Sequence, residues 1–219
     1  PTVGAFSDLL ISKGGTTILT EVPEMFGAET LLMNRCANEE LFNKTVDLIN
    51  NFKNYFTSHN QTIYENPSPG NKKGGISTLE DKSLGCTQKS GSAPVCGVLS
   101  YGECVKTSGL NLLSAPGNDL VAATALAASG AHIVLFTTGR GTPFASPVPT
   151  VKISSNSTLA GKKKNWIDFN AGVLVEDAEL DTVGQQLFDY VIDVASGRKV
   201  CSEEAGFHDM AIFKQGVTL

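Results

Sequence analysis

The chain has 219 residues, of which 41% are hydrophobic and 18% charged, a composition that suits one globular domain with a sizeable core. A net charge of −5, the lack of a long basic run and the lack of an apolar run of roughly 18–20 residues argue against nucleic-acid binding and a membrane helix. Five cysteines without a C-x-x-C pair argue against a disulfide framework or a zinc site, and predict reduced thiols in the cytoplasm.

The first half of the chain predicts mainly helices. Residues 4–13 form a candidate helix that ends at a glycine pair, and the β-branched segment 16–20 predicts a strand. Apolar residues recur every three or four positions over 39–56, which predicts the clearest helix of the chain. Prolines and glycines within 57–75 predict a loop without regular structure. Ser77 and Glu80 then have the spacing of a capping box that begins a helix of about ten residues.

The second half alternates between strands and helices. We predict strands at 94–100, 109–115, 132–138 and 150–155, helices at 120–128 and 182–195, and a last short strand at 210–213. The apolar run 132–138 is typical of a central strand that is buried on both faces. Because 109–138 has the size of a right-handed parallel crossover, the sequence predicts an α/β fold: a Rossmann-like, mostly parallel sheet with helices on both faces.

Polar residues follow each predicted strand. In open parallel sheets, ligands bind beyond the carboxyl ends of the strands, so these residues should meet at one edge. They are Glu21 and Glu24, then Asn118 and Asp119, then Thr137, Thr138, Arg140 and Thr142, and finally Ser154, Ser155 and Asn156. Turn formation alone explains any one of these loops, but it explains poorly why carboxylates, an arginine and hydroxyls share one edge.

Several of these side chains have a structural alternative. Asp119 can instead cap the helix that follows it, and Arg140 can pin its loop through a salt bridge. Asn71 and Lys72 lie in a glycine-rich loop that suits an anionic ligand, or that forms a plain surface turn. Lys89, near a helix end and seven residues after Lys82, is a site candidate or a solvated lysine.

The same segments resemble the altronate and galactarate dehydratase family. The resemblance rests on TTILTEVPEMFGAE (16–29), ENPSPGNKKGGISTLEDKSLGCTQKSG (65–91), GLNLLSAPGND (109–119), LFTTGRGTPF (135–144), WIDFNAG (166–172) and AIFKQGVTL (211–219). It covers nearly the whole chain, and P-G-N-K-x-G-G together with F-T-T-G-R-G-T-P is highly specific. The segments 20–29 and 211–219 favour altronate over galactarate as the substrate.

The resemblance implies an iron(II)-dependent, intracellular hydro-lyase that removes water from a sugar acid. We expect D-altronate to give 2-keto-3-deoxy-D-gluconate in hexuronate catabolism, with another divalent cation able to replace Fe2+. Residues 1–219 would be the single C-terminal α/β domain of a larger enzyme, whose N-terminal β domain and middle domain lie outside this chain. A homodimer is left open. The isolated domain can fold and still be inactive if the site lies between domains.

Roles follow from residue type, because the resemblance brings no residue-level assignment. We predict oxygen ligands for the metal (Glu21, Glu24, Asp119), proton-transfer or charge-stabilising groups (Lys72, Lys89, Asp119) and substrate-binding groups (Asn71, Ser90, Thr137, Thr138, Arg140, Thr142, Asn156). Arg140 suits a carboxylate because guanidinium binds both oxygens at once. Two other hypotheses stay open: a non-catalytic substrate- or metal-binding module, and a nucleotide-binding domain. The second is disfavoured because no glycine fingerprint follows a strand.

Overall fold

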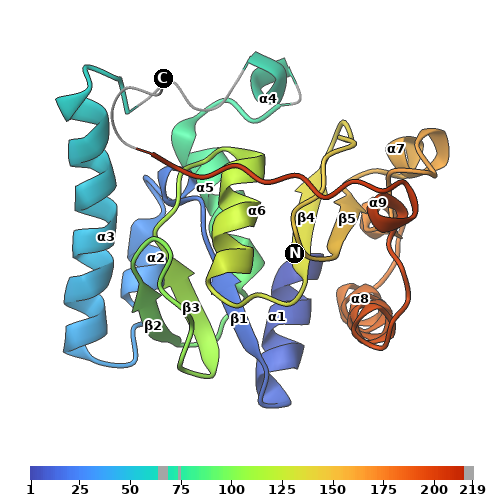
Figure 1. The fold of residues 1–219 in the computed structure, drawn as a ribbon, viewed down its shortest axis with the longest axis horizontal. Coiled ribbons are helices and arrows are strands. Elements are labelled where there is room, and N and C mark those ends of the chain that lie inside the picture. Colours follow the sequence, from blue (N-terminus) through green and yellow to red (C-terminus); the bar gives the residue numbers. More distant parts are fainter. Residues whose placement is uncertain (64–68, 74, 215–219) are drawn as a thin grey trace.

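Parallel strands in two separate sheets form the centre of the molecule (Figure 1). The structure, a computed structural model, describes residues 1–63, 69–73 and 75–214. Within them, the first sheet has the order β1 (Thr16–Leu19), β3 (Gly109–Leu113), β2 (Val95–Leu99). The second has the order β4 (Val134–Thr138), β5 (Thr150–Ser154), β6 (Phe169–Asn170). Every pairing is parallel. The predicted α/β class with a Rossmann-like arrangement is thereby confirmed.

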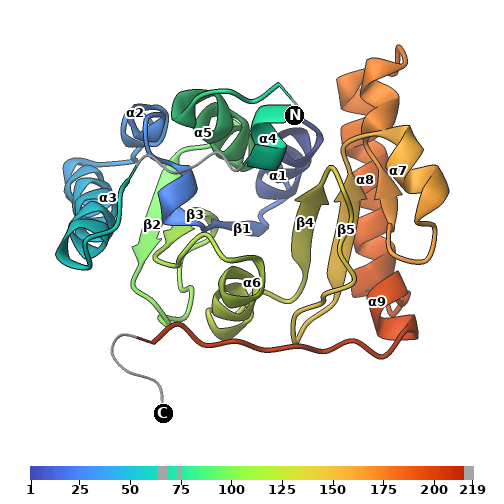
Figure 2. The ribbon, with the colours of Figure 1, turned by 90° about the horizontal axis from the view of Figure 1, so that it is seen from above.

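Helices surround both sheets (Figure 2). They are α1 (Thr2–Ser12), α2 (Glu29–Met33), α3 (Glu39–Ser58), α4 (Pro69–Lys73), α5 (Leu79–Thr87), α6 (Asp119–Ala128), α7 (Ser157–Lys162), α8 (Leu180–Ala195) and α9 (Cys201–Glu204), with short 3-10 turns η1 (Val22–Glu24), η2 (Gln88–Ser90) and η3 (Gly172–Val175). The predicted helices 4–13, 39–56, 120–128 and 182–195 correspond to α1, α3, α6 and α8. None of these helices, in the part of the chain that is described, has both the length and the apolar character needed to cross a bilayer.

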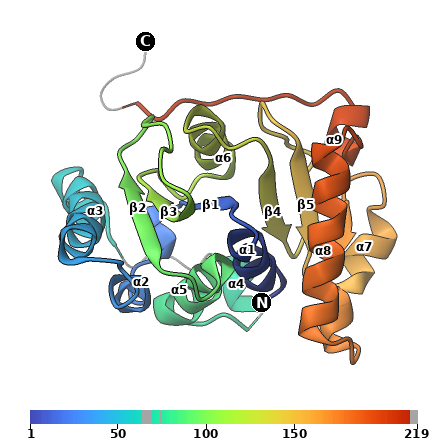
Figure 3. The same ribbon diagram turned by 90° about the horizontal axis from the view of Figure 1, so that it is seen from below.

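The middle strand of each sheet forms the core. β3 and β5 are buried along their whole length. One apolar cluster packs α3 and η1 against the first sheet, and another packs α1 and α8 against β5. α1 contacts α8, β1 and η2, so it bridges the two halves on one face, while α6 lies between the sheets on the opposite face (Figure 3).

The C-terminal segment crosses the α6 side of both halves in an extended conformation (Figure 1). Its amides are bonded outside any sheet: Asp209 donates to the carbonyl of Ala145 at 3.0 Å, Ala211 to the Thr124 hydroxyl at 3.1 Å and Phe213 to the Tyr101 hydroxyl at 2.8 Å. The predicted strand at 210–213 is therefore wrong, because side-chain oxygens take the place of a neighbouring strand.

Two local predictions in the first half are also corrected. α4 lies inside the predicted loop 57–75, because proline is tolerated at the first helical position, where its missing N–H has no helical partner. Residues 64–68 and 74 of that loop lie outside the described residues. The cap of α5 is Thr78, whose hydroxyl accepts from the amide of Asp81 at 3.1 Å, and Ser77 instead donates to the Asp81 carboxylate.

The predicted crossover unit is divided between the sheets. β3 cannot pair with β4, because β1 and β2 already occupy both of its edges. β4 is consequently an edge strand rather than the central strand, and it is only partly buried after Val134. The central position in the second sheet belongs to β5. The sequence pattern could not distinguish these strands, since both contain mainly apolar and β-branched residues.

Candidate functional site

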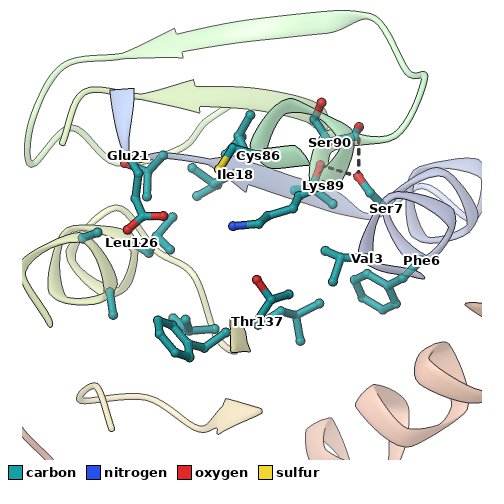
Figure 4. A pocket seen from close by; sticks show the side chains of 18 of the residues that line it. Val3, Phe6, Ser7, Ile18, Glu21, Cys86, Lys89, Ser90, Leu126 and Thr137 are labelled. Carbon is teal, nitrogen blue, oxygen red and sulfur yellow. Dashed lines mark hydrogen bonds between the residues drawn. The ribbon is translucent and has the colours of Figure 1, made fainter. Parts of the chain in front are cut away.

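A cavity of about 1150 Å³ lies between the two sheets (Figure 4). Consecutive residues of β1 and β4 form its two long walls. Residues of α1, α5, α6 and α8 line the remaining sides. Beyond the carboxyl ends of β1 and β4, the loops place acidic, basic and hydroxyl groups along the cavity. This is the position that a parallel α/β sheet offers to a ligand.

The cavity brings together most of the predicted site residues. Those that line it are Glu21, Glu24, Asn71, Lys89, Ser90, Asp119, Thr137, Thr138, Arg140 and Asn156. Lys72 and Thr142 are not among its lining residues: Lys72 is exposed on α4, and Thr142 lines a second cavity of about 410 Å³ that it shares with Asp119. Residues from the loops after β1, β3, β4 and β5 therefore meet at this cavity, whereas Asn118 and Ser154, which were expected at the same edge, do not line it.

Lys89 projects into the middle of the cavity from η2 (Figure 4). Its ammonium group faces the Thr137 hydroxyl across the cavity. Burial by itself would lower the pKa of Lys89, but the acidic groups of Cys86, Glu21 and Glu24 outweigh burial and raise that pKa. A charged amine is thus held where an anionic ligand can reach it.

Glu21 follows β1 and has an unusual backbone conformation. Its φ of 65° and ψ of 58° place a non-glycine residue in the left-handed region, which costs of the order of 1–2 kcal/mol. The strained turn directs its carboxyl group into the cavity (Figure 4). Burial, reinforced by the negative charge of Glu24, raises the pKa of Glu21 to about 7. At neutral pH this carboxyl group can accept or donate a proton.

Glu24 is held by two neighbours from α5. One carboxylate oxygen lies 2.7 Å from the ammonium group of Lys82, and the other accepts a hydrogen bond from the Cys86 thiol at 2.9 Å. Burial alone would raise the pKa of Glu24, but these hydrogen bonds lower it below its ordinary value. The Cys86 thiol is itself partly buried, and this burial raises its pKa to about 12. Glu24 is therefore a fixed negative charge beside Glu21.

The predicted metal ligands do not form a ligand set on their own. Lys82 and Cys86 occupy both oxygens of Glu24, and Lys89 lies among the acidic residues. In residues 1–63, 69–73 and 75–214, no three His, Cys, Asp or Glu side chains are placed to hold a metal ion together. Glu21 and Asp119 stay candidate ligands, and a third His, Cys, Asp or Glu ligand would have to come from outside the described residues.

The loop after β4 forms one rim of the cavity. The Thr138 hydroxyl accepts from the amides of Arg140 at 3.3 Å and Gly141 at 2.9 Å, which tightens the turn. Asn156 caps α7 and also donates to the Gly139 carbonyl at 3.2 Å. These side chains fix the backbone that carries Arg140. Two predicted binding groups, Thr138 and Asn156, therefore have structural roles as well.

Asp119 stands at the start of α6 on the opposite rim. The helix cap is Asn118, whose side chain accepts from the amide of Val121 at 3.2 Å, so the alternative role of Asp119 as the cap is wrong. Burial and the charge of Glu24 raise the pKa of Asp119. Ser90 is less available to a ligand, because its buried hydroxyl donates to the Thr87 carbonyl at 2.6 Å.

Cys86 is the main functional candidate that sequence reasoning missed. A lone cysteine outside a C-x-x-C pair gave no signal of its role. Its spacing was informative in retrospect, because Lys82, Cys86 and Lys89 are separated by four and three residues and so face one side of a helical segment. The spacing of Lys82 and Lys89 was recognised, and both do reach the cavity.

A cavity that gathers carboxyl, amine, guanidinium and hydroxyl groups beyond the carboxyl ends of parallel strands is the kind of site at which α/β domains bind small ligands. Residues 1–218 match the family described as D-galactarate/altronate dehydratase, C-terminal. The chain therefore belongs to this family, which confirms the resemblance found in its motifs.

Individual relatives agree with that assignment. The chain is 64% identical over 220 residues to the altronate dehydratase of Bacillus subtilis and 60% identical over 219 residues to that of Escherichia coli. Both alignments cover 100% of this chain and 44% of the relative. It is 38% identical over 217 residues to the galactarate dehydratase (L-threo-forming) of Escherichia coli, covering 97% of the chain and 42% of that protein. It is 31% identical over 222 residues to the beta subunit of (2R)-sulfolactate sulfo-lyase from Chromohalobacter salexigens, covering 97% and 56%.

Proposed function

We propose that this chain is the C-terminal α/β part of a longer hydro-lyase that dehydrates D-altronate to 2-keto-3-deoxy-D-gluconate. The observation that carries the proposal is that one cavity holds both the partly buried amine of Lys89 and the carboxyl group of Glu21, whose pKa is about 7. The identity of 60–64% with two altronate dehydratases favours this substrate. The chain spans 44% of their length, so the remaining domains are part of the proposal.

Dehydration begins with removal of the proton from the carbon beside the substrate carboxylate. We assign the removal of this proton to the Glu21 carboxylate, because a base whose pKa lies near the working pH is efficient. Negative charge then develops on the carboxylate. Lys89 and Arg140 lie on opposite sides of the cavity, and their positive charges would stabilise that carboxylate as its charge grows.

The β-hydroxyl leaves as water and needs a proton as its C–O bond breaks. Asp119 is the candidate acid, because burial and Glu24 raise its pKa and so favour its protonated form. The product of this step is an enol, which rearranges to the 2-keto-3-deoxy acid. Glu24, fixed by Lys82 and Cys86, would take no proton itself but would keep the pKa of Glu21 high by charge repulsion.

The names of the relatives support the same division of roles. Altronate, galactarate and sulfolactate share a carboxylate with a hydroxyl on the adjacent carbon, and each has a leaving group one carbon further along. The leaving group is a hydroxyl in the two sugar acids and a sulfonate in sulfolactate. A domain common to all three enzymes is therefore suited to the shared carboxylate end. This supports the assignment of Lys89 and Arg140 to the carboxylate.

Iron(II), or another divalent cation in its place, stays a prediction from the family resemblance. A bound cation would act as a Lewis acid on the carboxylate or on the leaving hydroxyl. Glu21 and Asp119 are the carboxyl groups of this chain that could contribute to its binding; each would do so only as an ionised carboxylate, and so in place of the proton-transfer role given to it above. A cytoplasmic location and a homodimer likewise stay predictions.

The decisive experiment is an anaerobic turnover assay of the full-length enzyme with iron(II), using altronate and galactarate as parallel substrates. We expect formation of the 2-keto-3-deoxy acid from altronate at a kcat/KM at least ten-fold above that from galactarate. A preference for galactarate would favour the alternative activity, for which the 38% identity gives weaker support. No turnover of either acid would contradict the proposal and favour a non-catalytic binding module.

A further inference from the structure

The cavity is larger than a six-carbon acid requires. Its volume is about 1150 Å³, whereas pockets of about 300–1,000 Å³ already enclose drug-sized ligands. The end near the start of β1 and β4 is also mainly apolar: it is lined by Leu10, Leu126, Ile133, Val191 and Ala195, beside Thr16 and His132. The amide of Gly15, just before β1, donates to the Leu10 carbonyl at 2.9 Å, which places Leu10 at this end. A polyhydroxy acid gains little from apolar walls.

The backbone of β1 also faces the cavity. In a parallel strand, the N–H and C=O of one residue point to the same neighbour, and successive residues alternate between the two neighbours. The Gly15 carbonyl accepts from the amide of Gly109, next to β3, at 3.2 Å. Thr16 and Ile18 therefore direct their backbone groups away from β3, toward the cavity.

β4 presents its backbone in the same way. The Val134 amide donates to the carbonyl of Pro149, and the Thr138 carbonyl accepts from Ser155, so these residues face β5. Because the direction alternates along the strand, Leu135 and Thr137 direct their backbone groups to the other side, into the cavity. No hydrogen bond joins β1 to β4, both of which are fully described. Two unpaired strand edges thus face each other across the cavity, although parallel sheets normally have paired interior strands.

We propose that an extended segment of the longer enzyme, from the part that this chain does not span, inserts between β1 and β4 as an additional strand. The inference rests on the proposal that residues 1–219 belong to a longer dehydratase, as the 44% coverage of the altronate dehydratases supports. The inserted strand would pair with both edges and join the two sheets into one. It would pair with the first part of each edge, at Thr16 and Leu135, in the apolar part of the cavity, and would end before Thr137, so that the part lined by Lys89 and Glu21 is left to the substrate.

The walls specify the chemistry of the inserted segment. One face of the new strand would meet α1 and α8, with Phe6 and Val191, and the other would meet α6, with Ala122 and Ala123. Alternate side chains of the segment should therefore be apolar on both faces, as in a central parallel strand. The alanines leave space for larger side chains on the α6 face.

The alternative is that β1 pairs directly with β4, and the spacing between these two strands distinguishes the two arrangements. Neighbouring strands lie about 4.8 Å apart, whereas strands on either side of a third lie about 9.6 Å apart. A disulfide needs Cα atoms about 4.4–6.8 Å apart. Thr17 accepts a hydrogen bond from Ser7 of α1, and Leu135 packs in the same cluster as α1 residues, so their side chains share a face. Thr17→Cys with Leu135→Cys is therefore the test pair.

The experiment uses the full-length enzyme. A photoreactive phenylalanine analogue at Leu135 should cross-link to one peptide outside residues 1–219 of the same chain, and the same analogue at Val175, which is 82% exposed, should not reach that peptide. The double cysteine variant should form no disulfide between positions 17 and 135 under mild oxidation. The two single cysteine variants control for bonding to native cysteines.

Cross-links confined to residues 1–219 or to a second copy, or a disulfide between positions 17 and 135, would overturn the insertion. The cross-link does not depend on turnover, so the two proposals can fail separately. An active enzyme without the cross-link would remove the insertion alone. A cross-linked enzyme that dehydrates neither sugar acid would support the insertion and contradict the proposed function.

Discussion

Replacing Glu21 by glutamine tests the centre of the proposed site. The amide has the shape of the protonated carboxyl group and cannot accept the substrate proton. Because Glu21 is assigned as the base, we expect Glu21→Gln to lower kcat for altronate by about 10²–10⁴-fold. The left-handed backbone at this position is retained, so the variant changes the chemistry and leaves the strain in place.

The same variant should change stability in a pH-dependent way. In the wild-type chain, the surroundings of Glu21 raise its pKa from the ordinary value of 4.5 to about 7. The folded chain therefore holds the carboxyl proton of Glu21 more tightly than the unfolded chain does. Between those two values the folded state binds more protons, and the free energy of unfolding therefore falls as the pH rises. At about 1.4 kcal/mol per pKa unit, the loss by pH 8 is about 3 kcal/mol. Glutamine avoids this loss.

Thermal unfolding measures this effect directly. At about 2–4 °C per kcal/mol for a chain of this size, Glu21→Gln should raise Tm by about 6–12 °C at pH 8. It should leave Tm nearly unchanged at pH 4.5, where the wild-type carboxyl group is already protonated in the folded state. Glu176→Gln, at an exposed position outside the cavity, is the matched control. Equal Tm differences at both pH values would refute the electrostatic argument, and normal turnover would refute the role of Glu21 as the base.

Four further predictions address the other groups of the cavity. Lys89→Met should lower kcat/KM for altronate by about 100-fold, and Lys89→Arg should recover part of that loss. If the Met and Arg variants had the same kcat/KM, the role of Lys89 as a partner of the substrate carboxylate would be contradicted. Arg140→Lys should lower kcat/KM by about ten-fold or more without a fall in Tm, whereas matched losses of activity and stability would indicate a loop-pinning salt bridge. Asp119→Asn should weaken iron(II) binding in anaerobic titration, and unchanged affinity would remove it as a ligand. Cys86→Ala should lower Tm by about 3–12 °C because Glu24 loses a hydrogen bond worth about 1.5–3 kcal/mol, and Cys86→Ser should restore it.

Sequence periodicity predicted the fold class because local patterns and burial agree in most elements. The apolar face of α3 and the apolar strand β3 follow directly from residue spacing. The division into two sheets could not be predicted in this way, because strand pairing depends on which edges other segments have already occupied. β4 has the composition of a central strand, yet its outer edge faces the cavity.

Most of the candidate site could be predicted because its residues follow strands that end at one edge. This topological rule places Glu21, Asp119 and Arg140 at that edge, and the cavity contains all three. The contact between Cys86 and Glu24 joins residues 62 positions apart, and no local pattern encodes it. Thr142 lines the second cavity with Asp119 instead, and its place relative to the first cavity depends on the turn around Thr138, which no local pattern encodes.

The position of Arg140 also depends on a lysine that takes no part in the proposed chemistry. Lys152 of β5 is only 1% exposed, and its ammonium group donates to the Thr142 carbonyl at 2.9 Å. Burial lowers the pKa of Lys152, although the nearby carboxylate of Asp168 opposes that effect. A buried amine is costly unless its hydrogen bonds are made, so its bond to Thr142 resists displacement of this end of the loop. Asn156 binds the other end at Gly139. The loop is thus fixed on both sides of Arg140, which reduces the conformational entropy that a substrate carboxylate would otherwise have to overcome when it binds.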